Sequence, residues 1–343
     1  MSATRPGRLR AYLEFLAAVV YFFLARALAH SASMEMATED WRPLVDQFML
    51  LFLLLVGYGG FGLALDRQQH PLSEQGLPRR EGWTGEVGLG LAVGWALAVA
   101  CVLPLMVGGG IAIVLTTHLN SWGWLLADAV FFSLVALVEE VAFRGYGFQR
   151  FVQAVGPFGA SLGYAVFYAI LQALLPGSSR LSVAISVVFS LLLSAAYLRS
   201  RALWVSWGIN FGWKASRALV FGLAVSGINS HSPVVQGDPM GPFWLTGGGY
   251  GLDGTWIAFF VLLAAFPVVY RLTRDLDYRY NAPVIIPGGI AVDLDAAARR
   301  QHEAATREAA PAAPGLVQIL PAAAPAPSAI PSAAPEPVAE NPD

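Results

Sequence analysis

The chain has 343 residues, of which 56% are hydrophobic and 13% are charged, and its mean hydropathy is +0.57. This composition excludes an ordinary soluble globular protein and indicates a membrane protein. The formal net charge is −2 and the basic residues are scattered singly, which excludes a nucleic-acid-binding surface, while a single cysteine excludes an internal disulfide and a cysteine-based metal cluster.

Apolar stretches long enough to cross a hydrocarbon layer of ~30 Å recur along the chain. The predicted spans cover residues 11–29, 47–65, 88–116, 122–143, 158–175, 181–198, 203–225 and 255–270. The third stretch is long enough to break near Pro104 and Gly108. We therefore predict an all-α fold, a polytopic transmembrane helical bundle of about eight spans, with membrane lipid as its surroundings.

The distribution of arginine predicts the orientation of these spans. Arginines collect in alternate loops, which the positive-inside rule places in the cytoplasm. These residues are Arg5, Arg8, Arg10, Arg67, Arg79, Arg80, Arg144, Arg150, Arg199, Arg201, Arg271, Arg274 and Arg279. The opposite loops carry only Arg42 and Arg180. We therefore predict an integral, multi-pass protein with both termini in the cytoplasm and a long external loop over 226–254.

Composition divides the chain into four parts. Residues 1–116 are predicted to form the N-terminal transmembrane helices, and 117–275 a membrane domain that carries the chemistry. Residues 276–310 are predicted to be a cytoplasmic linker with a short surface helix. Residues 311–343 are rich in alanine and proline and cannot bury a core, so they are predicted to be a disordered tail.

The densest group of ionisable side chains ends the fourth predicted span, in the sequence LVEEVAFRGYG. Ionisable residues at membrane depth are costly, so each needs a partner or a function. Glu140 and Arg144 lie four residues apart on one helical face and can pair. Glu139 is turned by about 100° from Glu140, so its carboxylate is free to meet another helix and to act as a general base on water. The alternative is a buried ion network without chemistry.

This EExxxR pattern resembles the first motif of the CAAX-protease and bacteriocin-processing (CPBP or ABI) family of intramembrane endopeptidases, which includes the type II prenyl endopeptidases. The resemblance implies that Glu139 activates water while Glu140 pairs with Arg144. The second family motif, an aromatic residue and a histidine four positions later, aligns with Tyr168 and Gln172. The third, a histidine and an asparagine after a Leu-Trp pair, aligns with Asn210 and Lys214. The resemblance covers roughly 122–256.

Three positions depart from the family pattern. Gln172 and Asn210 have no titratable nitrogen and are not usual zinc ligands, so no cofactor or metal is expected. Lys214, the only lysine of the chain, follows an aromatic and apolar stretch and must find an anion or lose its proton. By family geometry its partner is Glu139. The alternative is that Lys214 reaches along its helix to lipid headgroups.

Three functions remain open from the sequence. The first is a catalytically impaired family member that keeps a cavity for a peptide or a membrane-protein partner. The second is an active intramembrane endopeptidase with Glu139 as general base and the amides of Gln172 and Asn210 as oxyanion donors. The third is a small-solute transporter or a membrane scaffold. Resemblance to a bacterial branch of the family implies the bacterial inner membrane.

Overall fold

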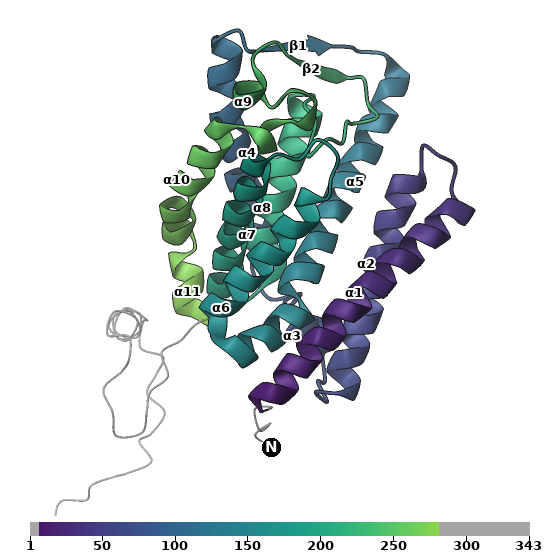
Figure 1. Cartoon of the computed structure of the whole chain (residues 1–343), viewed down its shortest axis with the longest axis vertical. Helices are drawn as coiled ribbons and strands as arrows, with labels where there is room; N and C mark the ends of the chain where they lie inside the picture. Colours follow the sequence, from purple (N-terminus) through teal and green to yellow (C-terminus); the bar gives the residue numbers. More distant parts are fainter. Residues whose placement is uncertain (1–6, 281–343) are drawn as a thin grey trace, which may run out of the picture. The chain divides into compact units, whose positions relative to one another are not determined.

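The structure of the protein, a computed structural model, describes residues 7–280 and is built almost entirely of helices (Figure 1). The N-terminal elements are α1 (Arg8–Met36), α2 (Arg42–Ala64), α3 (Pro71–Glu74), α4 (Trp83–Val107) and strand β1 (Ile111–Leu115). The central helices are α5 (Leu119–Arg144), α6 (Tyr146–Ala173), α7 (Arg180–Ser200) and α8 (Leu203–Ala215). The C-terminal elements are a π-helical turn (Ser216–Val220), strand β2 (Val235–Pro239), α9 (Phe243–Thr246), two 3-10 turns (Gly248–Tyr250 and Leu252–Gly254), α10 (Trp256–Leu272) and α11 (Arg274–Tyr280).

The predicted membrane helices are confirmed in part. Helices α1, α2, α4 and α7 are long and apolar enough to cross a membrane, and α10 is a shorter apolar helix. The bundle is therefore that of an integral membrane protein, while the count of eight spans stays a prediction. Residues 281–343, which hold the whole predicted tail and most of the predicted linker with its surface helix, lie outside the described residues.

Two predicted spans are wrong at their C-terminal ends. Helix α4 stops at Val107, because Pro104 stands in its last turn and Gly109 follows with a left-handed φ of 73°. The rest of the predicted span over 88–116 contains β1, which pairs antiparallel with β2 and places Ile113 opposite Gly237. The predicted span over 203–225 likewise ends as a helix at Val220, and Gly222 adopts a left-handed φ of 64°.

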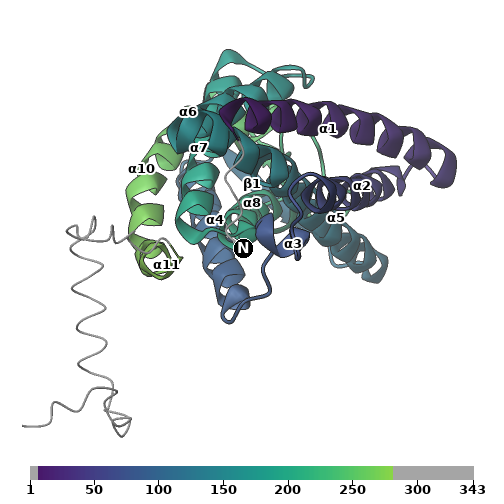
Figure 2. The same cartoon turned by 90° about the horizontal axis from the view of Figure 1, so that it is seen from below.

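Helix α8 lies inside the bundle (Figure 2). Most of its residues are buried, as expected for a helix that is apolar on nearly every side. It packs against α4, α5 and α7, and the buried side chains of α4 and α7 share one core with those of α8 and α10. Since both α5 and α8 carry the ionisable residues singled out in the sequence, this central position brings those residues together.

The arginine-rich loops lie at one end of the bundle. Successive long helices alternate in direction in Figure 1, and side-chain contacts join their ends at the level of α3 and α11. These contacts are Arg80 Nη2 to Ser200 O (2.7 Å), Arg199 Nη1 to Asp277 Oδ2 (2.9 Å) and Arg150 Nη1 to Asp66 Oδ1 (2.9 Å). Three of the arginines grouped in the sequence, Arg80, Arg150 and Arg199, therefore make contacts at this end of the bundle, and the orientation stays a prediction.

Candidate functional site

Four glycines set the position of α8 against α4. Gly90 and Gly94 on α4 face Gly208 and Gly212 on α8, so each helix carries a GxxxG pair. A Cβ atom at any of them would collide with the backbone of the opposing helix, as at Gly94 against the carbonyl oxygen of Ile209. Small residues at this spacing let helix backbones approach closely in lipid. We call this contact of four glycines the glycine clamp. Asn210 lies on the opposite face of α8, which faces the site.

The carboxylate of Glu140 and the guanidinium of Arg144 form the predicted intrahelical pair at the end of α5. Arg144 Nη1 donates to Glu140 Oε1 at 3.2 Å, and Arg144 Nη2 donates to the backbone oxygen and the Oγ of Ser190 on α7 at 3.0 and 2.9 Å. The side chain of Arg144 is 2% exposed and that of Glu140 is fully buried. Arg144 therefore ties α5 to α7, and both side chains are buried away from any substrate.

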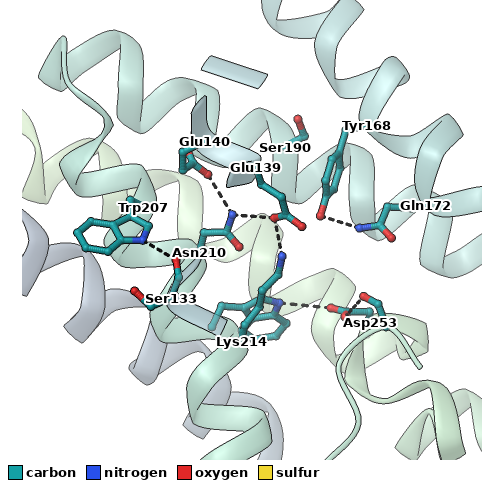
Figure 3. A network of polar contacts seen from close by, with 12 residues as sticks. Ser133, Glu139, Glu140, Tyr168, Gln172, Ser190, Trp207, Asn210, Lys214 and Asp253 are labelled. Carbon is teal, nitrogen blue, oxygen red and sulfur yellow. Dashed lines mark hydrogen bonds and ion pairs between the residues drawn. The ribbon is translucent and has the colours of Figure 1, made fainter. Parts of the chain in front are cut away.

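Glu139 faces α8, as its helical position predicts. Its Oε2 atom accepts a hydrogen bond from Lys214 Nζ at 2.5 Å and another from Asn210 Nδ2 at 2.9 Å (Figure 3). Lys214 points into the bundle rather than to lipid headgroups, and its side chain is 7% exposed. The side chain of Glu139 is 18% exposed. The structure thus brings together three of the residues selected from the sequence in one ion-paired cluster.

Asn210 bridges the two glutamates. Besides its bond to Glu139, its Nδ2 atom donates to Glu140 Oε1 at 3.1 Å, and Asn210 itself is completely buried. Because ionised carboxylates only accept, the amide nitrogen must face them, which fixes the orientation of the amide. Both amide hydrogens are therefore used by carboxylates, and Asn210 has no donor left for a reacting carbonyl group.

Gln172 lies apart from this cluster. It stands near the end of α6, where its Nε2 atom donates to Tyr168 Oη of the same helix at 2.7 Å. Figure 3 shows this pair approaching Glu139 from the side opposite Asn210. No hydrogen bond joins Gln172 to Glu139 or Lys214 among the described residues. The structure therefore places Gln172 at the edge of the site rather than in its network.

A second ion pair adjoins the first and was missed in the sequence. Arg217, one turn after Trp213, is buried and places Nη1 at 2.7 Å from Asp253 Oδ1. Burial alone would raise the pKa of Asp253. The charge and the hydrogen bond of Arg217 lower that pKa by more than burial raises it, so the net pKa is below its usual value. A signal was present in the sequence, since an arginine inside a predicted span requires an acidic partner.

A small polar pocket lies between the two ion pairs. Its free interior is about 10 Å³, close to the minimum that can hold one water molecule. The residues that line it are Tyr168, Gln172, Ile185, Ser186, Phe189, Trp213, Lys214, Arg217, Ser226 and Asp253. The pocket therefore contacts both Lys214 and the loop that carries Asp253.

The charges of the site balance. Its three acidic and three basic side chains are Glu139, Glu140, Asp253, Arg144, Lys214 and Arg217. The donor set around Glu139 does not fit a zinc ion, because its neighbours are an ammonium group and an amide nitrogen rather than imidazole, thiolate or further carboxylate. A group of three or more potential metal ligands is not found within residues 7–280.

The arrangement of α5 to α8 defines a helical membrane protein with a buried glutamate site. Comparison with known families gives a match to the family described as type II CAAX prenyl endopeptidase Rce1-like, over residues 120–216. This segment contains all six residues selected from the sequence. The match confirms the resemblance: over residues 120–216 the chain is similar to the CAAX-protease family. No curated protein and no solved structure matches the chain.

Proposed function

We propose that the protein is a catalytically impaired member of the CAAX-protease family that binds a peptide or a membrane-protein partner without cleaving it. One observation carries this proposal, the ion pair between Lys214 Nζ and Glu139 Oε2. In the family, the position of Lys214 holds an asparagine and that of Asn210 a histidine. With a neutral side chain at 214, the acidic groups of the site would exceed the basic groups by one, and Glu139 would be the unpaired carboxylate.

The ion pair engages a carboxylate oxygen through which a general base would act. A base must lie within about 2.6–3.2 Å of the water it deprotonates, and its proton affinity must suit that transfer. The ammonium group of Lys214 and the amide of Asn210 both donate to Oε2 of Glu139, so this oxygen is already engaged within the protein. Glu139 is therefore bound to two protein donors at the position where a reacting water would have to approach Oε2.

The active endopeptidase is the less supported alternative. It requires the amides of Gln172 and Asn210 to donate hydrogen bonds to an oxyanion, yet both hydrogens of Asn210 are bound to carboxylates. Gln172 keeps one amide hydrogen beyond its bond to Tyr168. A single remaining donor is a poor oxyanion site, because each lost donor costs about 10²–10³ in rate. A transporter or scaffold role has no observation that favours it.

Peptide cleavage by the purified protein in liposomes tests the proposal. A prenylated peptide ending in a CAAX sequence is the substrate, and Glu139→Ala is the comparison variant. We expect the unaltered protein and Glu139→Ala to give the same background. Cleavage by the unaltered protein that disappears in Glu139→Ala would overturn the proposal and establish the active endopeptidase.

A reversion experiment asks whether the substitutions are the cause. The triple variant Gln172→His, Asn210→His and Lys214→Asn is expected to gain about 10²–10⁴ in rate, which is the usual contribution of positioned acid–base groups. Each single reversion should do little, because such groups act as one unit. Gln153→His, on the exposed face of the same helix as Gln172, is the control for an added histidine.

The proposal places the protein in the bacterial inner membrane with both termini in the cytoplasm. The grouping of arginine-rich loops at one end of the bundle supports this orientation. A topology reporter after Arg201 should be cytoplasmic, and one inserted at Gln236, in β2, should be external. Detection of both reporters on one side would contradict the orientation.

A further inference from the structure

The long loop between the π-helical turn and α10 contacts the end of α8 through the carboxylate of Asp253. Oδ1 of Asp253 contacts Arg217 Nη1 at 2.7 Å and accepts from Trp213 Nε1 at 3.3 Å. Its other oxygen, Oδ2, accepts from Ser226 Oγ at 2.8 Å, within the loop itself. One side chain therefore joins both ends of the loop to the end of α8.

The backbone around Asp253 holds it in a fixed place. Gly251 adopts a left-handed φ of 88°, where a Cβ atom would collide with the carbonyl oxygen of Ala224. On the other side of Asp253, Thr255 caps α10 by accepting from the backbone nitrogen of Ala258 at 3.2 Å. An L-residue other than glycine is strained at such a φ, so the turn depends on Gly251. The backbone on both sides of Asp253 is therefore held in a defined conformation.

The side chains that Asp253 contacts flank Lys214 in the sequence. Trp213 directly precedes it, and Arg217 lies three residues later in the π-helical turn that begins at Ser216. Arg217 also donates from Nε to the backbone oxygen of Trp213 at 2.9 Å and stacks its guanidinium over the indole at 4.2 Å. Single π-helical turns are rare and often lie at functional sites. Lys214 therefore lies in the last turn of α8, between two residues whose side chains are both bound by Asp253.

We infer that Asp253 is a positioning residue, a latch by which the external loop holds Lys214 on Glu139. This inference deepens the proposed function, because it names what controls the ion pair of the same site. A lysine side chain has several rotatable bonds and is costly to order, so a close contact with Glu139 depends on a fixed backbone. Release of the latch frees the end of α8 and separates Lys214 from Glu139. The external face thereby gains control of the buried site.

The single lysine of the chain makes this measurable. A membrane-permeant acylating reagent followed by peptide mass spectrometry reports on the side chain of Lys214 alone. The labelling rate in proteoliposomes, divided by the rate in denatured protein, measures how often Lys214 leaves Glu139. Asp253→Asn should raise this ratio about tenfold, because a hydrogen bond to a charged group shifts an opening equilibrium by about that factor. Asp253→Glu should restore a slow rate.

Matched variants separate a latch from general destabilisation. Asp238→Asn removes the same charge from an exposed position in β2 and should leave labelling unchanged. Ser226→Ala removes one bond to Asp253 without changing any charge, and it should raise labelling about twofold, since neutral hydrogen bonds are weaker. It also serves if Asp253→Asn does not fold. In a Glu139→Gln background Lys214 is already released, so Asp253→Asn should add nothing.

Two outcomes would overturn the inference. Labelling of folded Asp253→Asn or of Ser226→Ala at the unaltered rate would mean that Glu139 alone holds Lys214. Additive effects of Asp253→Asn and Glu139→Gln would mean that Asp253 acts on stability and not on the ion pair. Both readouts are independent of peptide cleavage. If the protein proved to be an active enzyme, the proposed function would be refuted, but the labelling result would still stand.

Discussion

Paired charges occur both in the centre of the bundle and in the hairpin formed by α1 and α2, but the two regions differ in exposure. In the centre, Arg144 is 2% exposed and Glu140 is fully buried. In the hairpin, Arg26 Nη1 lies 3.3 Å from Asp46 Oδ2, yet the side chain of Arg26 is 50% exposed. Loss of one partner is therefore expected to cost more folding free energy in the centre than in the hairpin. Central charges must be matched one by one, whereas a hairpin arginine can exchange its partner for water or headgroups.

The largest expected effect tests the central pair. Arg144→Ala leaves Glu140 as a buried carboxylate without its cation, which commonly costs about 3–5 kcal/mol. Thermal or denaturant unfolding in detergent should show a large loss of stability or of folded yield. Arg79→Ala, at an exposed position in the loop before α4, is the control. Equal melting of the two variants would show that loss of a central charge costs no more stability than loss of an exposed one.

An intermediate effect is expected at Glu139. Glu139→Gln removes a charged acceptor of Lys214, which should cost about 1–3 kcal/mol. The double variant Glu139→Gln with Lys214→Met removes both charges and should recover most of that stability, because a pair replaced together leaves no unmatched charge. Unfolding of both single variants and the double variant in one series gives the coupling free energy. A coupling close to zero would contradict a stabilising contact between Glu139 and Lys214.

The smallest effect is expected in the hairpin. Arg26→Ala should cost about 0–1 kcal/mol, because an exposed ion pair gains little over solvation. The effect should shrink further as salt is raised, since screening acts on exposed charges. Unfolding curves at low and high salt measure both. If Arg26→Ala were as damaging as Arg144→Ala, another surface would have to cover Arg26, and the contrast between the two regions would fail.

Local spacing made the central site predictable. The four-residue separation of Glu140 and Arg144 predicts their pair, and the turn of about 100° to Glu139 predicts a carboxylate facing another helix. The contact with Lys214 was predicted from family geometry, because 75 residues separate it from Glu139 and no periodic pattern links them. The predicted roles of Gln172 and Asn210 in an impaired site remain predictions.

The parts that the sequence did not reveal depend on distant segments. Strands β1 and β2 are far apart in the chain, and the apolar sequence of β1 reads as the end of a transmembrane helix. The pairing of Arg217 with Asp253 depends on the path of a glycine-containing loop, which has no periodicity to interpret. The contact of the glycines of α4 with those of α8 is also tertiary, because each GxxxG pair indicates close packing without naming its partner.

The glycine clamp also determines where the chain can be divided. The family match begins at residue 120, but α8 inside it packs on α4, which lies before it. A fragment that starts at the match would present to lipid a flat helix face without side chains at Gly208 and Gly212, which acyl chains fill poorly. Two separately translated pieces, cut between Val107 and Leu119, should therefore find each other in the membrane through α4 and α8. The segment that matches the family therefore packs on a helix that lies outside it.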